Sequence, residues 1–153
     1  MITHKFDSDI TKVKSGIIVH GCNARGVMGS GVAKQLRATY PDIFTDYKNL
    51  IDDFYIDCCS PLGRVAWSDI SADLVIANAI TQNFYGRDAK KYVSYDALDA
   101  AFQRVASFAE ASDCTIHIPF LIGAGLGGGN ANIIQRIVEE NTQDLEVVYH
   151  HWK

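Results

Sequence analysis

Residues 16–33 read GIIVHGCNARGVMGSGVA and carry the strongest indication of the fold. Residues 16–19 form a short apolar run rich in β-branched side chains, as in a strand buried on both faces. Glycines follow at positions 26, 29 and 31, and apolar residues then recur at helical spacing at Val32, Ala33 and Leu36. A strand, a glycine-rich turn and a helix in this order indicate one unit of an α/β fold.

The alternation of strand and helix continues along the rest of the chain. Short apolar runs predict further strands at residues 64–67, 74–77, 116–118 and 145–149. Between them lie four helical patterns: one ending near Tyr40 before Pro41, one over residues 43–51, one beginning at the N-cap Ser94, and one over residues 133–138. The pattern after Ser94 predicts a buried face made of Leu98, Ala101, Phe102, Val105, Phe108 and Ala109.

No repeat, low-complexity tract or Pro/Ser-rich linker divides the sequence. We therefore expect residues 1–153 to form a single domain with an α/β layer fold and a largely parallel sheet. In such sheets, ligands bind outside the carboxyl ends of the strands.

The composition excludes several classes of protein. With 48% hydrophobic and 21% charged residues, the chain is typical of a globular protein and not of a disordered one. The net charge of −4 lacks the basic excess of nucleic-acid binders, so we do not expect a nucleic-acid partner. The four cysteines and five histidines show no metal-ligand spacing, so we expect no metal and no cofactor.

The sequence also contains no signal-peptide core and no apolar run near the roughly 18 residues of a membrane span. We therefore expect a cytoplasmic protein with no membrane partner. The adjacent His150 and His151 are expected to lie at a solvated strand end rather than to bind metal.

The glycines are concentrated in two places. Of twelve, five lie between Gly16 and Gly31 and five between Gly123 and Gly129. Each cluster follows a predicted strand and precedes a predicted helix, where glycines let backbone amides approach phosphate oxygens. No Lys or Arg lies between Gly26 and Gly31 or between Gly123 and Gly129, so neutral amides would hold the ligand. The sequence predicts a diphosphate held between two loops, with tight turns of no binding role as the alternative.

Several motifs, in this order along the chain, resemble those of the macro domain family, α/β modules that bind ADP-ribose. Asp9-Ile10-Thr11 is similar to the family's G-D-I-T turn, with Ser8 in place of glycine. Asn23 resembles the family's asparagine at a strand end, residues 28–33 its first glycine loop, and residues 122–128 its second. The resemblance implies a three-layer α/β/α fold with a mixed, largely parallel central sheet.

The form of these motifs is closest to the branch that holds ADP-ribose 1''-phosphate phosphatases and terminal ADP-ribose hydrolases. The pairs Thr81-Gln82 and Tyr85-Gly86 also resemble that branch. The ligand implied is therefore ADP-ribose, ADP-ribose 1''-phosphate, or ADP-ribose attached to a protein.

The resemblance also implies roles for individual residues. Asp9 would accept a hydrogen bond from the adenine amine, the Ile10 backbone would contact the same base, and Asn23 would bind the distal ribose. Tyr149 or Trp152 would stack on adenine. The diphosphate would be held by backbone amides of Gly29, Ser30, Gly31, Val32, Gly123, Ala124, Gly125, Leu126 and Gly127. Taken alone, Asp9 is equally typical of a turn cap and Tyr149 of a core residue.

Catalysis would depend on His20 and on position 130. A histidine at the place of His20 is associated with catalysis in the phosphatase-like branch, and an imidazole could protonate a leaving group or activate water. The alternative is a histidine satisfied within the core. The family's catalytic aspartate is replaced here by Asn130, which cannot accept a proton as a base.

Three functional hypotheses follow. The first is a protein that binds ADP-ribose and hydrolyses ADP-ribose 1''-phosphate or a related derivative with the help of His20. The second, motivated by Asn130, is a non-catalytic reader of ADP-ribose or of ADP-ribosylated protein. The third is a module that binds nucleotides or RNA ends, against which the net charge of −4 argues.

Overall fold

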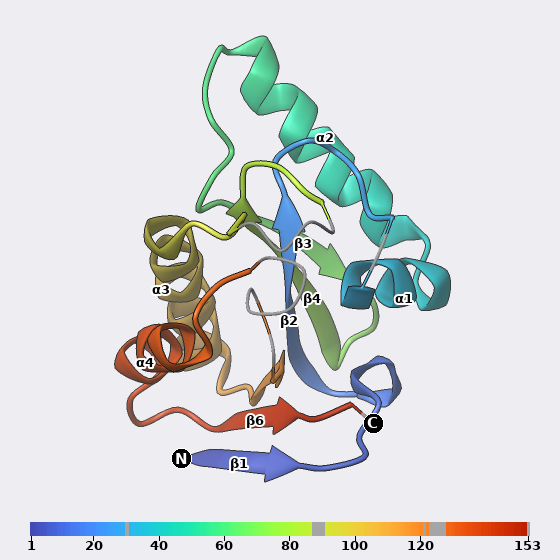
Figure 1. Ribbon diagram of the computed structural model, residues 1–153. Coiled ribbons are helices and arrows are strands. Elements are labelled where there is room, and N and C mark those ends of the chain that lie inside the picture. The colour runs from blue at the N-terminus through green and yellow to red at the C-terminus, as the bar shows by residue number, and fades with distance from the viewer. Residues whose placement is uncertain (30, 87–90, 121, 123–127, 153) are drawn as a thin grey trace.

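The computed structural model describes residues 1–29, 31–86, 91–120, 122 and 128–152. Within them, one six-stranded sheet has the strand order β1-β6-β5-β2-β4-β3 (Figure 1). Its strands are β1 (Ile2–Lys5), β2 (Gly16–Asn23), β3 (Val65–Asp69), β4 (Leu74–Gln82), β5 (Ile116–Pro119) and β6 (Val147–His150). Neighbouring strands run parallel except β3, which is antiparallel to β4.

In the described part of the chain, four α-helices cover the two faces of this sheet. They are α1 (Gly31–Thr39), α2 (Asp42–Ile56), α3 (Tyr95–Ser112) and α4 (Ala131–Asn141), and a short 3-10 helix, η1 (Ile10–Lys12), precedes β2. Helices α1 and α2 lie on one face, and α3 and α4 on the other (Figure 1). The predicted three-layer α/β/α class with a mixed, largely parallel sheet is confirmed. None of the described helices is long and apolar enough to cross a membrane.

Strand β2 lies between two hydrophobic cores. Ile17 and Val19 pack in the core beneath α3 and α4, whereas Ile18 packs in the core beneath α1 and α2. Successive side chains of a strand point to opposite faces, so a strand covered on both sides is apolar at nearly every position. This is why the run at residues 16–19 is continuous rather than alternating.

Two details of the outer elements differ from expectation. The sequence pattern did not predict β1, because three of its four residues are exposed at the sheet edge and carry no apolar alternation. Phe108, expected in the core, is 36% exposed, and its ring stacks on Trp67 at a centroid distance of 4.5 Å. It lies on the flank of the apolar face of α3, where that face meets the edge strand β3.

The N-cap of α3 is as predicted, since Ser94 Oγ accepts a hydrogen bond from Ala97 N–H at 3.1 Å.

The sheet reverses its winding direction between β2 and β5. These two strands are parallel neighbours. After β2 the chain passes to α1 on one face, and after β5 it passes to α4 on the other (Figure 1). Connections that leave in opposite directions open a crevice at the carboxyl ends of the two strands, where α/β sheets bind their ligands. In the sequence, Gly26, Gly29 and Gly31 of the first glycine cluster follow β2, and the second cluster follows β5.

Candidate functional site

Asn23 ends β2 and shapes the loop that follows it. Its side-chain Nδ2 donates to the carbonyl oxygen of Val27 at 2.7 Å, and its Oδ1 accepts from the N–H of Arg25 at 2.9 Å. The residue is only 8% exposed. Asn23 therefore stabilises its own loop, and its predicted contact with the distal ribose stays a prediction.

Tyr47 of α2 is a residue of this site that sequence reasoning missed. Its hydroxyl donates toward Asn23, with the backbone oxygen at 2.6 Å and Oδ1 at 2.8 Å, and it accepts from the N–H groups of Gly26 at 3.0 Å and Val27 at 3.1 Å. Burial raises the pKa of Tyr47, so the hydroxyl keeps its proton. In the sequence, Tyr47 is one apolar position of a helical pattern, and nothing there indicates which loop its hydroxyl meets.

The first glycine loop needs its glycines for conformational reasons. Gly26 has φ +81° and lies against the side chain of Lys48, where a Cβ would come within 3.0 Å of Cδ. Gly31 has φ +64° and begins α1, and no described neighbour lies within 4 Å of the position that a Cβ would take. Both angles fall in the left-handed region, which glycine adopts without a Cβ clash. Gly29 is exposed beside Val27, and Val32 packs partly against the core beneath α1 and α2.

His20 lies in the core rather than at the open end of the sheet. It has no exposed surface, and its Nε2 is 2.6 Å from Oδ1 of Asn78. Because an amide oxygen only accepts, Nε2 carries the proton of the neutral ring. Burial lowers the pKa of His20 to about 4, so the ring is uncharged at neutral pH. In this conformation no surface of His20 is open to a ligand, which favours the core interpretation over the catalytic one.

From Asn78, the partner of His20, further hydrogen bonds lead through the core to Asp46 on α2. Asn78 Nδ2 donates to the carbonyl oxygen of Ala66 at 2.9 Å and to Ser68 Oγ at 3.0 Å, which assigns its oxygen to His20. Ser68 Oγ in turn donates to Oδ2 of Asp46 on α2 at 2.7 Å. The histidine is thus one end of a hydrogen-bonded chain beneath α2.

Asn130 caps α4. Its Oδ1 accepts from the backbone N–H groups of Asn132 at 2.9 Å and Ile133 at 3.3 Å, and its own N–H donates to the hydroxyl of Tyr95 at 2.9 Å. Asparagine and aspartate are both favourable N-caps, so either residue at position 130 stabilises the start of α4.

Asp9 caps η1 with one of its two carboxylate oxygens. Its Oδ1 accepts from the N–H of Thr11 at 2.9 Å and from the Thr11 hydroxyl at 2.6 Å. Within the described ranges, Oδ2 makes no hydrogen bond. The half-buried Asp9 thus serves as a turn cap and keeps a second acceptor available, while the Ile10 side chain is buried beneath it.

Ser8, which stands where the family has glycine, bonds to the last strand. Its Oγ lies 2.7 Å from Nδ1 of His150, and its N–H donates to the carbonyl oxygen of His151 at 3.0 Å. These contacts hold the segment before Asp9 against the end of β6.

Tyr149 packs inside the protein. It is 2% exposed, in the core beneath α3 and α4, with its ring 5.2 Å from that of His4 and 5.9 Å from that of Phe120. Neither face of the ring is open to a base, so the stacking role given to Tyr149 finds no support and the core interpretation fits. Trp152, the other residue considered, is 58% exposed.

The carboxyl end of β4 carries further polar and aromatic groups beside the site. Thr81 Oγ1 is buried, and no described group hydrogen-bonds to it. Gln82 Nε2 donates to the carbonyl oxygen of Phe84 at 2.8 Å. The exposed rings of Phe84 and Tyr85 stack at 5.0 Å, with the guanidinium of Arg25 5.3 Å from the Phe84 ring centre.

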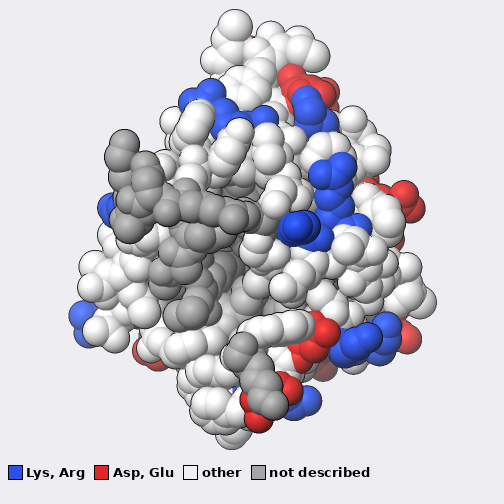
Figure 2. Space-filling view, turned by 45° about the vertical axis from the view of Figure 1, so that its right-hand side comes forward, with Lys and Arg blue, Asp and Glu red and all other residues white. Residues whose placement is uncertain are grey.

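Part of the predicted site lies outside the described residues. Ser30 and the loop residues Gly123, Ala124, Gly125, Leu126 and Gly127 fall there, and their roles stay predictions. Across the described ranges, no three His, Cys, Asp or Glu side chains converge on one point that could hold a metal ion. On the face in Figure 2, Lys and Arg side chains lie in separate groups with Asp and Glu among them.

The fold and the site define an α/β module in which glycine-rich segments follow the neighbouring parallel strands β2 and β5 in the sequence. No family model matches the chain. A curated relative, the ADP-ribose 1''-phosphate phosphatase of Saccharomyces cerevisiae (strain YJM789), is 30% identical over 135 residues, which cover 79% of this chain and 73% of the relative.

Solved structures agree with this relative. A macrodomain protein from Streptomyces coelicolor superposes with a TM-score of 0.81 at 24% identity, covering 98% of both chains. DarTG of Thermosipho africanus in complex with ADP-ribose superposes with a TM-score of 0.75 at 13% identity, covering 97% of this chain and 41% of that one. The chain belongs to the macro domain family, as its motifs predicted.

Proposed function

We propose that this protein binds ADP-ribose in the crevice at the carboxyl ends of β2 and β5. The observation that carries the proposal is the reversal of winding at these two neighbouring strands, each followed by a glycine-rich segment. The relatives add weight, because one is named for acting on ADP-ribose 1''-phosphate and one solved structure holds ADP-ribose.

The proposed adenine contact uses a carboxylate oxygen that is still available for bonding among the described residues. Asp9 Oδ2 accepts from the adenine amine while Oδ1 keeps its cap contacts to Thr11. The backbone amides at the start of α1, after Gly31, face the diphosphate, and the helix dipole favours the negative charge there. We also propose that backbone amides of the second glycine loop, residues 123–127, bind the same diphosphate, and that Asn23 contacts the distal ribose.

Titration calorimetry with ADP-ribose tests this proposal. We expect saturable binding with one ligand per chain, and weaker binding of AMP, which lacks the second phosphate and the distal ribose. Absence of any binding heat with ADP-ribose, in protein shown to be folded by circular dichroism, would refute it.

A second candidate function is hydrolysis of ADP-ribose 1''-phosphate, which the Saccharomyces relative favours. In that reaction water attacks phosphorus, the bond to the 1'' oxygen breaks, and inorganic phosphate and ADP-ribose are released. His20 would act through the position of β2 rather than by touching the substrate, since it is buried. Asn130 would contribute as the cap of α4.

One measurement distinguishes the two candidate functions. Phosphate release from ADP-ribose 1''-phosphate above the rate without protein supports the hydrolase. Binding without release supports a reader of ADP-ribose or of ADP-ribosylated protein.

A further inference from the structure

We propose that helix α2 positions the first ligand loop through two tyrosine hydroxyls, of which Tyr47 is the principal one. Tyr47 and Tyr55 are eight residues apart, about two helical turns, and therefore lie on one face of α2. Both hydroxyls reach the segment that connects Asn23 to the glycine loop. This inference rests on the proposed function, because the loop matters here as a binding element for ADP-ribose.

The Tyr47 hydroxyl uses all of its bonding capacity on this segment. A hydroxyl has one proton and two acceptor lone pairs. The proton faces two oxygens of Asn23, at 2.6 and 2.8 Å, and the lone pairs receive the N–H groups of Gly26 and Val27. One side-chain atom thus joins the end of β2 to the start of the glycine loop.

Apart from the hydrogen bonds of the Asn23 side chain with Arg25 and Val27, the described residues restrain the loop little at this point. Gly26 is buried, and Tyr47 is the only partner of its N–H among the described residues. The left-handed φ of Gly26 is available to glycine at low cost, so this backbone does not hold its shape unaided. Beyond Gly26, Met28 is anchored in the core with 2% exposure, and three residues later Gly31 begins α1. The direction of the amides that would meet the diphosphate therefore depends on the Tyr47 hydroxyl.

Tyr55 adds a weaker restraint to the same segment. Its hydroxyl donates to the carbonyl oxygen of Ala24 at 2.6 Å, but the residue is 44% exposed, so water can replace this bond. The fully buried Tyr47 has no such replacement. Loss of the Tyr47 hydroxyl should therefore affect the loop more than loss of the Tyr55 hydroxyl.

The test compares Tyr47→Phe and Tyr55→Phe with the wild type. Phenylalanine keeps the ring in place, so Tyr47→Phe removes the hydroxyl contacts while the core beneath α2 stays filled. In protein without ligand, we expect faster hydrogen exchange at the amides of Gly26 and Val27. We expect the affinity for ADP-ribose to fall about tenfold in Tyr47→Phe and by a smaller factor in Tyr55→Phe.

Ser68→Ala is the matched control for stability. It removes another buried hydroxyl beneath α2, whose partners are Asp46 and Asn78, and leaves the loop contacts intact. We expect it to lower Tm as Tyr47→Phe does but to leave ADP-ribose affinity at the wild-type value. Equal loss of affinity in both variants would show a general effect of stability and would overturn the inference.

Failure of the inference and failure of the proposed function give different results. If the wild type does not bind ADP-ribose, the proposed function fails and the positioning role fails with it. If the wild type binds and Tyr47→Phe binds equally well, only the inference is overturned. Should Tyr47→Phe not fold, Tyr55→Phe decides, and unchanged affinity and exchange in that variant overturn the inference.

Discussion

His20 and Asn78 occupy paired positions on the neighbouring strands β2 and β4, and their side chains share a hydrogen bond of 2.6 Å with no exposure to solvent. Burial keeps the imidazole neutral, and the hydrogen bond to Asn78 fixes its proton on Nε2. His20, which the sequence places at a catalytic position, therefore joins the two central strands β2 and β4 through a buried side-chain hydrogen bond.

The first prediction concerns the stability of this pair against pH. The pKa of His20 is lowered to about 4 from its ordinary value of 6.5, so the native state favours the neutral ring. Its contribution is complete above pH 6.5 and is lost as pH falls toward 4, since the unfolded chain takes up the proton first. The loss should approach about 3 kcal/mol over that window.

Urea unfolding at several pH values measures this effect. His20→Gln retains an N–H donor but does not titrate in this range, so its stability should fall less between pH 6.5 and 4 than that of the wild type. Parallel pH profiles for the two proteins would contradict the prediction.

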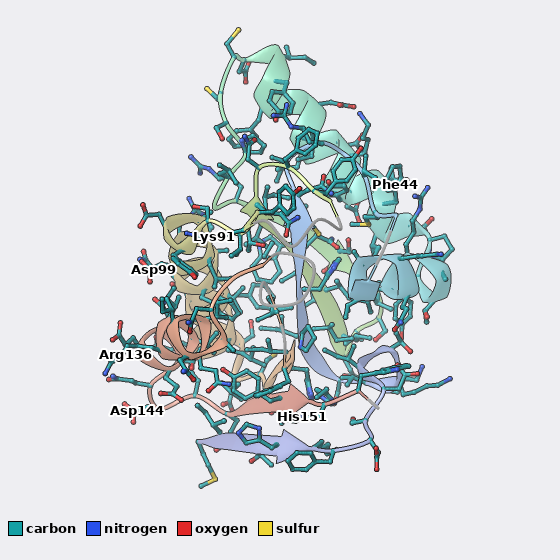
Figure 3. The ribbon with its side chains drawn as sticks, viewed as in Figure 1. Phe44, Lys91, Asp99, Arg136, Asp144 and His151 are labelled. Carbon is teal, nitrogen blue, oxygen red and sulfur yellow. The ribbon has the colours of Figure 1, made fainter. Side chains whose placement is uncertain are left out.

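The second prediction concerns the edge of the sheet where β6 pairs with β1 and with β5. Nδ1 of His4 lies 2.8 Å from Nε2 of His151, and Nδ1 of His117 lies 2.8 Å from Nε2 of His150. Figure 3 marks His151 at the end of β6 beside β1. Each contact needs one unprotonated nitrogen, and burial, the first cause, lowers the pKa of His150 to about 4, with the nearby His117 and Lys5 adding to it.

Acidification should therefore loosen this edge of the sheet. The N–H of Val147 donates to the carbonyl oxygen of Met1, and the N–H of His151 donates to that of Lys5. From pH 7.5 to pH 4 we expect both amides to lose protection from hydrogen exchange, after correction for the intrinsic rate. The amide of Ile76, within the central strand β4, is the internal control. Equal changes at all three sites would contradict a local effect.

The third prediction distinguishes the capping role of Asp9 Oδ1 from the proposed binding role of Oδ2. Asp9→Asn can still cap η1 with its side-chain oxygen but loses the charge that we assign to the adenine contact. A hydrogen bond to a charged group contributes about 1.5–3 kcal/mol, so ADP-ribose affinity should fall about tenfold or more while Tm changes little. Calorimetry and thermal unfolding of Asp9→Asn beside Asp9→Ala measure both. Wild-type affinity in Asp9→Asn would remove Asp9 from the binding site.

The fourth prediction concerns Asn130→Asp. Aspartate caps a helix as well as asparagine does, and a negative charge at a helix N-terminus stabilises it by about 0.3–1 kcal/mol. The variant should therefore unfold at slightly higher temperature. Under the hydrolase hypothesis, the new carboxylate also supplies a base, so phosphate release from ADP-ribose 1''-phosphate should increase.

Phosphate release by Asn130→Asp has its own control. The double variant Asn130→Asp with Asp9→Asn should release phosphate more slowly at limiting substrate, because it binds the substrate less tightly. If Asn130→Asp is as inactive as the wild type but binds ADP-ribose normally, the reader hypothesis is supported instead.

Much of the architecture could be predicted because it is encoded locally. The apolar run at residues 16–19 and the N-cap Ser94 each reflect the structure of their own neighbourhood, and both were predicted correctly. Strand β1 could not be predicted, because an exposed edge strand of four residues leaves no periodic apolar pattern.

The sequence by itself determined the order of the helices and of the strands after β1, the place of the two glycine clusters and the family, because short-range periodicity and motifs record local backbone needs. Only the tertiary structure decided that His20 is buried against Asn78, 58 residues away, and that the Tyr47 hydroxyl holds the loop after Asn23. It also decided that Tyr149 packs in the core. Such contacts join side chains on separate elements, and which of them meet depends on how the helices and strands pack together.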